Sequence, residues 1–125
     1  MSFSHLITKG RTRRYSFSLF ESDGSTDVNI AATDNVRVKI YRGSGATPAL
    51  DIESANDTAN GSGITFTAGT NDFLLTIQQD DSDALNLGVY EMEVNLVDDS
   101  DSDWIKHAET GVLHVIQSGG GDVDL

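Results

Sequence analysis

Apolar and polar residues alternate along much of this chain with the period of a β-strand. The pattern is clearest between residues 64 and 117, where apolar residues occupy every second position of four runs. These positions are Ile64 and Phe66; Phe73, Leu75 and Ile77; Tyr90, Met92, Val94 and Leu96; and Leu113 and Val115. A period of two turns one face of a strand toward a core and the other toward water. The four runs therefore predict a compact β-structure with no room for a catalytic insertion.

The first half of the chain continues this pattern in shorter runs. Inward positions are predicted at Tyr15, Phe17 and Leu19, at Val36, Val38 and Ile40, and in brief strands near 28–30 and 50–52. Turn residues recur about every ten positions, which is typical of a sandwich of short strands. The sequence predicts an all-β fold, an immunoglobulin-like antiparallel β-sandwich of about seven to nine short strands. The Cys…Trp…Cys signature of antibody domains is not in the sequence.

Three segments depart from the alternation. Residues 80–83 are Asp-Asp-Ser-Asp and precede Ala84 and Leu85, so we expect one short helical turn near 80–86 with carboxylates capping its N-terminus. Residues 54–63 are polar and contain two glycines, which predicts an exposed loop. Thr110-Gly111 is interpreted as a break between a strand at 104–109 and the last strand at 112–117.

The chain has 125 residues, which is enough for one domain with short appendages. Residues 1–10 show no clear period and are predicted to form an N-terminal arm, followed by the sandwich over 11–117. Residues 118–125, Ser-Gly-Gly-Gly-Asp-Val-Asp-Leu, have the composition of a flexible acidic C-terminal tail. No apolar run is long enough for a signal peptide or a membrane span, so synthesis in the cytoplasm is expected.

The net charge of −12 is distributed unevenly. Residues 1–42 hold seven basic and four acidic residues, whereas residues 43–125 hold one lysine and sixteen acidic residues. The acidic part at 43–125 would be repelled by phosphate, which makes nucleic acid an unfavourable partner. The charge either keeps the surface solvated or creates a bipolar molecule, whose basic leading segment docks on an acidic surface.

The order of the motifs resembles that of a known family. The first motif is Arg13-Arg14-Tyr15-Ser16-Phe17. The Asp23-Gly24 turn and the Val-rich segment at 36–40 follow it. The later motifs are Ile64-Thr65-Phe66-Thr67, Phe73-Leu74-Leu75-Thr76-Ile77, the acidic helical segment leading to Leu85-Asn86-Leu87-Gly88-Val89-Tyr90, the acidic turn at 98–101, and Gly111-Val112-Leu113-His114-Val115. In this order they resemble the immunoglobulin-like domain of tailed-phage virion proteins, including the N-terminal domain of phage baseplate upper proteins.

This resemblance implies a non-enzymatic virion structural protein. We expect a capsid decoration or cement protein, which binds the outside of the phage head and stabilises contacts of the major capsid protein. A tail, baseplate or neck component is the alternative. The implied partners are the major capsid protein or other virion proteins and neighbouring copies of this chain, without nucleic acid, membrane or cofactor. A carbohydrate- or calcium-binding module is a third hypothesis, from another class.

Candidate chemistry is sparse. Asp99, Asp101 and Asp103 have the spacing of the start of a calcium loop, but Trp104 and Thr110 stand where Gly and Glu are needed. We therefore predict no metal site, with these three aspartates as the Ca²⁺ candidate to be tested. The sequence has no Cys, and no Ser lies in a nucleophile elbow, so an enzyme is not expected.

Two places in the chain are candidates for partner binding. Basic residues lie beside apolar ones near the N-terminus, although charge there could instead protect an edge strand from aggregation. Trp104, the single Trp, is either a core residue at a strand start or an interface anchor. The predicted partner-binding residues are Phe3, Leu6, Ile7, Arg11, Arg13, Arg14 and Trp104.

Overall fold

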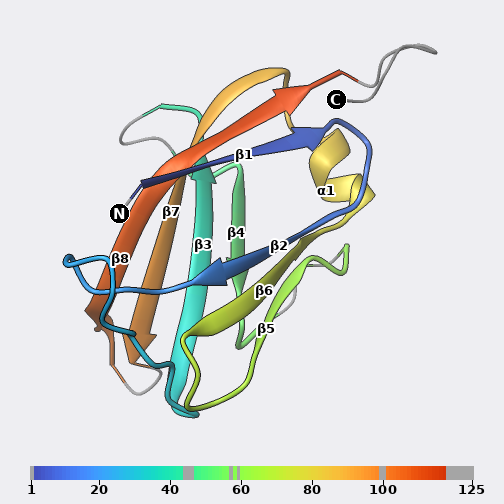
Figure 1. Ribbon diagram of the computed structural model, residues 1–125. Coiled ribbons are helices and arrows are strands. Elements are labelled where there is room, and N and C mark those ends of the chain that lie inside the picture. The colour runs from blue at the N-terminus through green and yellow to red at the C-terminus, as the bar shows by residue number, and fades with distance from the viewer. Residues whose placement is uncertain (1, 44–46, 57, 59, 99–100, 118–125) are drawn as a thin grey trace.

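The computed structural model describes residues 2–43, 47–56, 58, 60–98 and 101–117, with backbone alone at residues 2 and 101–103. In this part of the chain, eight strands form two sheets (Figure 1). The strands are β1 (Ser2–Thr8), β2 (Arg13–Ser18), β3 (Asp34–Tyr41), β4 (Leu50–Glu53), β5 (Gly63–Phe66), β6 (Asp72–Ile77), β7 (Gly88–Asp98) and β8 (Asp101–Ile116). The short helix α1 (Gln79–Asp83) connects β6 to β7. No helix in the described ranges is long and apolar enough to cross a membrane.

The strand order is that of an immunoglobulin-like sandwich. One sheet has the order β1-β8-β7-β3-β4 and the other the order β2-β6-β5. The strand pairs are antiparallel except for β1 and β8, which run parallel. Strands β2, β5 and β6 thus lie opposite a sheet built on β3, β7 and β8, as in variable-type immunoglobulin domains. The predicted all-β, immunoglobulin-like sandwich is confirmed.

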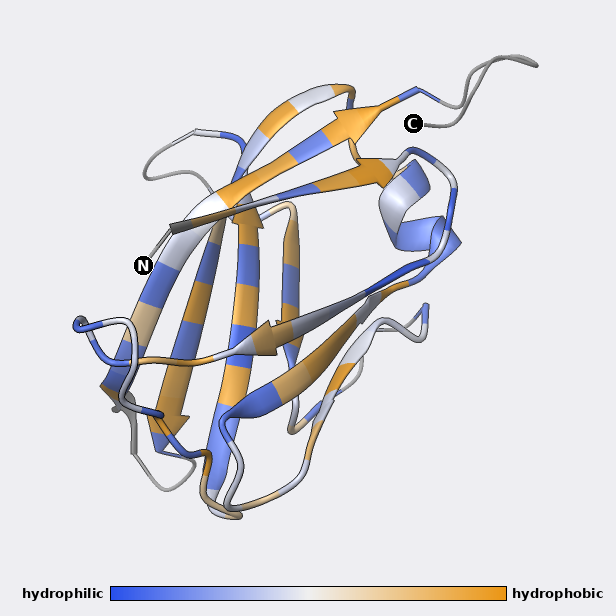
Figure 2. Cartoon of the chain, in the orientation of Figure 1, coloured by the Kyte–Doolittle hydropathy of each residue, from blue (hydrophilic) through white to orange (hydrophobic). Residues whose placement is uncertain are grey.

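The core lies between the two sheets and consists largely of the predicted alternating residues, with Ile7 added to them. Figure 2 shows the alternation as orange and blue bands along β3 and β7. The fully buried large side chains are Ile7, Leu19, Ile30, Val36, Val38, Ile40, Ile52, Leu75, Ile77, Met92, Leu96 and Leu113. Removal of this apolar surface from water is the main favourable term in folding.

The entry into β7 explains how the sandwich is held without a disulfide. The Asn86 backbone N–H donates a hydrogen bond of 2.8 Å to the Tyr90 hydroxyl, in a corner like the tyrosine corner of immunoglobulin domains. Met92 follows two residues later, where antibody domains place their second Cys, and it is fully buried. Apolar packing takes the place of the covalent link here.

The N-terminal arm predicted for residues 1–10 is wrong, because Ser2–Thr8 forms the edge strand β1. Phe3, His5 and Ile7 share its inward face, and Ile7 has no exposed surface. The alternation here is short and includes a histidine, which hides the strand pattern. The predicted tail at 118–125 lies outside the described residues.

The break predicted at Thr110-Gly111 is also wrong, since β8 continues through both residues. Gly111 faces Phe3 in the register of β1 and β8. A Cβ atom on Gly111 would lie 2.3 Å from the Phe3 carbonyl oxygen and 2.5 Å from its Cδ1 atom. The glycine therefore permits a close approach between β1 and β8 and does not mark a turn.

The helical turn forms at 79–83, but its predicted capping is wrong. No side chain caps its N-terminus, and Asp81 is buried instead. Its carboxylate accepts hydrogen bonds of 2.9 Å from Thr58 and Asn60 and a short one from the buried Ser62 hydroxyl. Burial would raise the pKa of Asp81, but these hydrogen bonds outweigh it and hold that pKa below its ordinary value. The loop predicted at 54–63 is thus anchored to α1.

Replacing Gly111 with Ala should displace β1, because the new methyl group meets the Phe3 backbone. We expect the free energy of unfolding to fall by about 1–3 kcal/mol, measured by urea denaturation. Thr110→Ala, at the exposed neighbouring position, is the matched control and should change it little. An unchanged urea midpoint for Gly111→Ala would contradict the packing described here.

Replacing Asp81 with Ala should leave the donors of Thr58, Asn60 and Ser62 without their acceptor. We expect a loss of about 1–3 kcal/mol in the free energy of unfolding at neutral pH. The stabilisation requires the carboxylate, so it is present above the unfolded pKa and is lost as pH falls through the lowered folded pKa. Urea denaturation at neutral and acidic pH measures both effects, with Asp80→Ala as the exposed control.

Candidate docking face

The outer face of the five-stranded sheet is built by the strand register. Leu6 of β1 and Val89 of β7 both pair with His114 of β8, so the three side chains form one row. Ile7, Tyr90, Leu113 and Val115, which are next to these residues in the chain, are buried on the opposite face, so this row points outward. Ser4, Val112, Glu91 and Tyr41 form the next row across β1, β8, β7 and β3.

Several outward positions carry apolar side chains. Val89 is 55% exposed and Leu87, just before β7, is 43% exposed. Leu6 and Val112 are half-buried on the same face. We call Leu6, Val89 and Val112, which share this face with His114 between Leu6 and Val89, together with the neighbouring exposed Leu87, the apolar patch. Single exposed apolar residues are common on protein surfaces, but a group of them on one sheet face is typical of an interaction site.

A shallow groove of about 680 Å³ borders the apolar patch. Ser4, Glu91, Thr110 and Val112 of the outward rows line it, together with Phe3, Gly111 and Met92, which pair with one another in the adjacent row. The glycine that admits β1 thus coincides with a depression on the sheet. The face offers shape, apolar surface and one carboxylate, which are features suited to binding.

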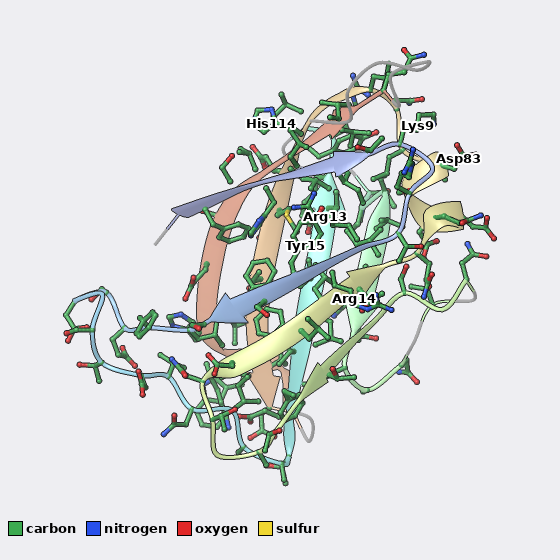
Figure 3. The ribbon with its side chains drawn as sticks, turned by 45° about the vertical axis from the view of Figure 1, so that its right-hand side comes forward. Lys9, Arg13, Arg14, Tyr15, Asp83 and His114 are labelled. Carbon is green, nitrogen blue, oxygen red and sulfur yellow. The ribbon has the colours of Figure 1, made fainter. Side chains whose placement is uncertain are left out.

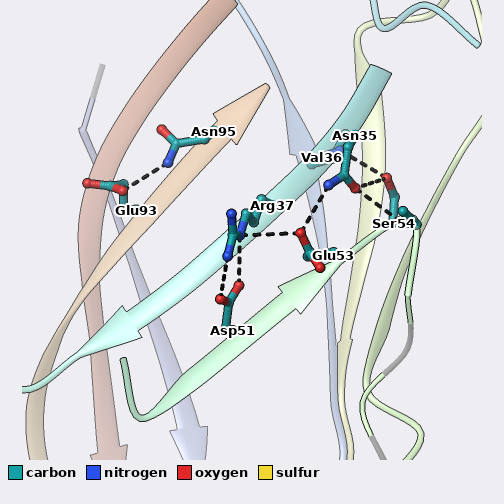
Figure 4. Close-up of polar contacts among 9 residues, drawn as sticks. Asn35, Val36, Arg37, Asp51, Glu53, Ser54, Glu93 and Asn95 are labelled. Carbon is teal, nitrogen blue, oxygen red and sulfur yellow. Dashed lines mark hydrogen bonds and ion pairs between the residues drawn. The ribbon is translucent and has the colours of Figure 1, made fainter. Parts of the chain in front are cut away.

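The opposite part of this face is occupied by charges that satisfy one another (Figure 4). Arg37 donates hydrogen bonds of 3.0 and 2.7 Å to Asp51 and lies 3.4 Å from Glu53. The bond to Asp51 is the largest cause of a raised Arg37 pKa. Since the pair is about one-third exposed, its contribution to stability is small. These charges align β3 with β4 and already have partners within the chain. The apolar patch is the part of the face whose exposed side chains are not covered in this way.

The docking residues predicted on β1 lie on its two different faces, one outward and one inward. Leu6 belongs to the apolar patch, whereas Ile7 has no exposed surface and cannot contact a partner while the fold is intact. Phe3 faces inward, and its ring centroid lies 5.2 Å from that of Phe17. Of the three residues predicted on β1, Leu6 therefore lies on the outer face, Phe3 is half-buried on the inward face, and Ile7 is inaccessible.

The predicted arginines lie elsewhere: Arg13 and Arg14 are on β2 (Figure 3), and Arg11 precedes it. Arg13 and Arg14 are exposed on that strand, and the Arg13 guanidinium lies 5.5 Å from the Tyr15 ring centroid. Arg11 lies in the turn between β1 and β2, where its carbonyl accepts a 2.7 Å hydrogen bond from Ser82. The three arginines are close in the chain, but successive strand residues point to opposite faces, so Arg13 and Arg14 face different sides of β2.

Trp104 lies near the start of β8, far along the strand from the apolar patch. It is 57% exposed, so its assignment to the core is wrong, while a role as interface anchor stays a prediction. A register shift between β7 and β8 at Leu96 and Val97 breaks the alternation here and leaves Ile105 51% exposed as well. Lys106 lies 5.6 Å from the Trp104 ring centroid and pairs with Asp34 at 2.5 Å.

The calcium candidate cannot be placed: Asp99 and the side chains of Asp101 and Asp103 lie outside the described residues. Sequence reasoning also missed Leu87, Val89 and Val112. Their signal was an apolar residue at an outward position, next to inward Tyr90 and Leu113.

Comparison with known proteins identifies no family. No family model matches the chain, and no curated protein matches it. Among solved structures, it is similar to the extracellular domain of the voltage-gated sodium channel beta4 subunit, described in parallel homodimers with a role in cell–cell adhesion. The identity is 15%, the match covers 94% of this chain and 93% of that one, and the TM-score is 0.43. A second sodium channel beta-subunit structure, described in a study of multimeric cell-adhesive interactions, is 10% identical over 92% of each chain, with a TM-score of 0.43. Likenesses this slight carry no functional argument.

A histidine lies where the two sheets meet. His5 packs between the edge strands, with its ring centroid 4.8 Å from that of Tyr15 and 5.0 Å from that of Phe17. Burial, and then the positive charge of Arg13, lower the pKa of His5. Below pH of about 6.5 the unfolded chain therefore binds a proton more readily than the folded one.

Stability should accordingly fall as pH drops from about 7 to about 5, through the window between the lowered folded pKa and the unfolded pKa. His5→Phe removes this titration but keeps an aromatic ring, so the variant should lose less stability over the same range. Urea denaturation of both proteins at the two pH values gives the comparison. Equal losses would show that His5 does not contribute.

Proposed function

We propose that this protein is a non-enzymatic structural protein of a bacteriophage particle, which acts as a capsid decoration protein on the outside of the head. The observation that carries the binding role is the exposed apolar patch beside a groove on the outer face of the five-stranded sheet. The motif order that resembles phage virion immunoglobulin-like domains supports the phage particle as its setting.

The buried polar groups support binding over catalysis. In the described part of the chain, every buried side-chain nitrogen or oxygen has a hydrogen-bond partner. Buried Asp34 accepts from Lys106 and from the Ala31 N–H, and buried Glu109 contacts His107 at 2.8 Å. Together with Asp81, these acids are engaged in holding loops and strands. Catalytic acids usually lie in a cleft with strongly shifted pKa values and groups free to act on a substrate.

A docking role of this kind needs little energy from each copy. Burial of apolar surface contributes about 25 cal/mol per Å², so a small patch gives a modest affinity. On a capsid, many equivalent sites are occupied together, and the bound copies stabilise the assembled state by mass action. Tail, baseplate or neck attachment is the second candidate, favoured by the resemblance to baseplate upper proteins.

Immunogold labelling of intact particles, combined with copy number from quantitative gel densitometry, tests the proposal. A decoration protein gives gold over the whole head and copies in the hundreds. Gold confined to one tail end, with far fewer copies, would support the second candidate. Absence of the protein from purified particles would overturn both.

Val89→Asp should disrupt docking without disrupting the fold, because the side chain is 55% exposed. A carboxylate buried in an apolar contact without a partner should lower capsid occupancy at least about tenfold. Thr65→Asp, at an exposed outward position of the other sheet, is the matched control. Occupancy is measured by co-sedimentation with particles lacking the protein, and a full complement of Val89→Asp would exclude the apolar patch.

A further inference from the structure

The edge strand β2 has one side without a strand partner. In the sheet order β2-β6-β5, it pairs only with β6 among the described strands. The Leu19 N–H donates to the Asn71 carbonyl at 2.9 Å, which makes these residues a hydrogen-bonded pair in the ladder. Since such pairs alternate in antiparallel sheets, the N–H and C=O groups of Arg14, Ser16 and Ser18 point away from β6. This edge can accept a further strand.

The space beside this edge is the seam between the two sheets. On its other side lies β1, which contacts β2 through a 2.8 Å hydrogen bond from the Tyr15 hydroxyl to the Leu6 carbonyl. Phe3 and His5 of β1 are half-buried in the seam against the ring of Phe17. An added strand would therefore find aromatic surface toward the molecule and water on its other face.

Charge restricts what can bind at this edge. Arg13 and Arg14 are both exposed at its beginning. They would repel a basic segment and attract an acidic one, so the charges that protect the edge from unselective pairing also make it selective. The edge thus fits an extended segment in which acidic residues alternate with apolar ones.

The chain contains a segment of this pattern outside the described residues. In residues 118–125, three glycines precede Asp122, Val123, Asp124 and Leu125. In an extended conformation, the two aspartates would share one face and the two apolar residues the other. The acidic face could meet Arg14 while the apolar face covers the aromatic seam.

We propose that residues 122–125 of one copy add as a strand to the free edge of β2 in a second copy. The uneven charge supports this pairing, because the segment comes from the acidic part of the chain and the edge lies in its basic part. The backbone groups of Arg14, Ser16 and Ser18 provide the hydrogen bonds, and the arginines select the segment. This association is independent of the apolar patch, so each proposal can fail without the other.

Sedimentation velocity over a range of protein concentrations tests the association, using the full chain and a chain ending at Gln117. The full chain should associate as concentration rises, and the shortened one should stay monomeric with an unchanged melting temperature. Amide hydrogen exchange at Arg14, Ser16 and Ser18 should be slower by at least about tenfold in the associated full chain. Two monomeric proteins, or equal association of both, would overturn the proposal.

Two additions identify the occupant. The peptide Ser-Gly-Gly-Gly-Asp-Val-Asp-Leu should restore slow exchange to the shortened chain, and the same peptide with both aspartates replaced by lysine should not. Slow exchange in the full chain at every concentration would show that the chain's own segment binds the edge, and would overturn the exchange between copies.

Charge reversal tests the arginine. Arg14→Glu should abolish association of the full chain, and combining it with Asp122→Arg and Asp124→Arg should restore it. Thr65→Glu, exposed on the same outer sheet face but away from the edge, is the control and should associate normally. Association that survives Arg14→Glu would overturn the assignment of the edge.

Discussion

The contact between Gly111 and Phe3 determines where the first strand can lie. Seven residues of β1 pair in register with β8, and this pairing requires a position without a side chain where the Phe3 backbone crosses. Once β1 is placed, Ile7 enters the core, Phe3 and His5 fill the seam, and Leu6 is turned outward. Both the outer docking face and the open seam beside β2 therefore depend on one glycine.

A second constraint acts at the turn between β1 and β2, which lies beside α1. Asp81 gathers Thr58, Asn60 and Ser62 around a single carboxylate, while Lys9 donates to the carbonyls of Asp83 and Leu85. The turn that leads from β1 to β2 is thereby fastened to α1. This contact orients the start of β2, where Arg13 and Arg14 lie.

The alternation of apolar residues was sufficient to predict the sandwich, since a period of two fixes the face of each side chain wherever one face is buried. This pattern gave wrong predictions where the role of a residue depends on a partner far away in the chain. Gly111 has the signature of a turn until Phe3, more than a hundred residues away in the chain, is placed beside it. Likewise, Asp81 has the signature of a helix cap until the loop at 58–62 supplies three donors. The docking face was missed because the pattern shows which residues point outward but not which strands lie side by side.

The parallel pairing of β1 with β8 has a mechanical consequence. Because both strands run in the same direction, the start of β1 and the end of β8 lie at opposite ends of the pair (Figure 1). A pull that separates Ser2 from Ile116 slides one strand along the other and loads all the hydrogen bonds between them in shear. Bonds loaded in this way must fail together, whereas an antiparallel pair pulled from one end opens bond by bond. Tension applied between these two residues is therefore carried by the whole β1–β8 ladder.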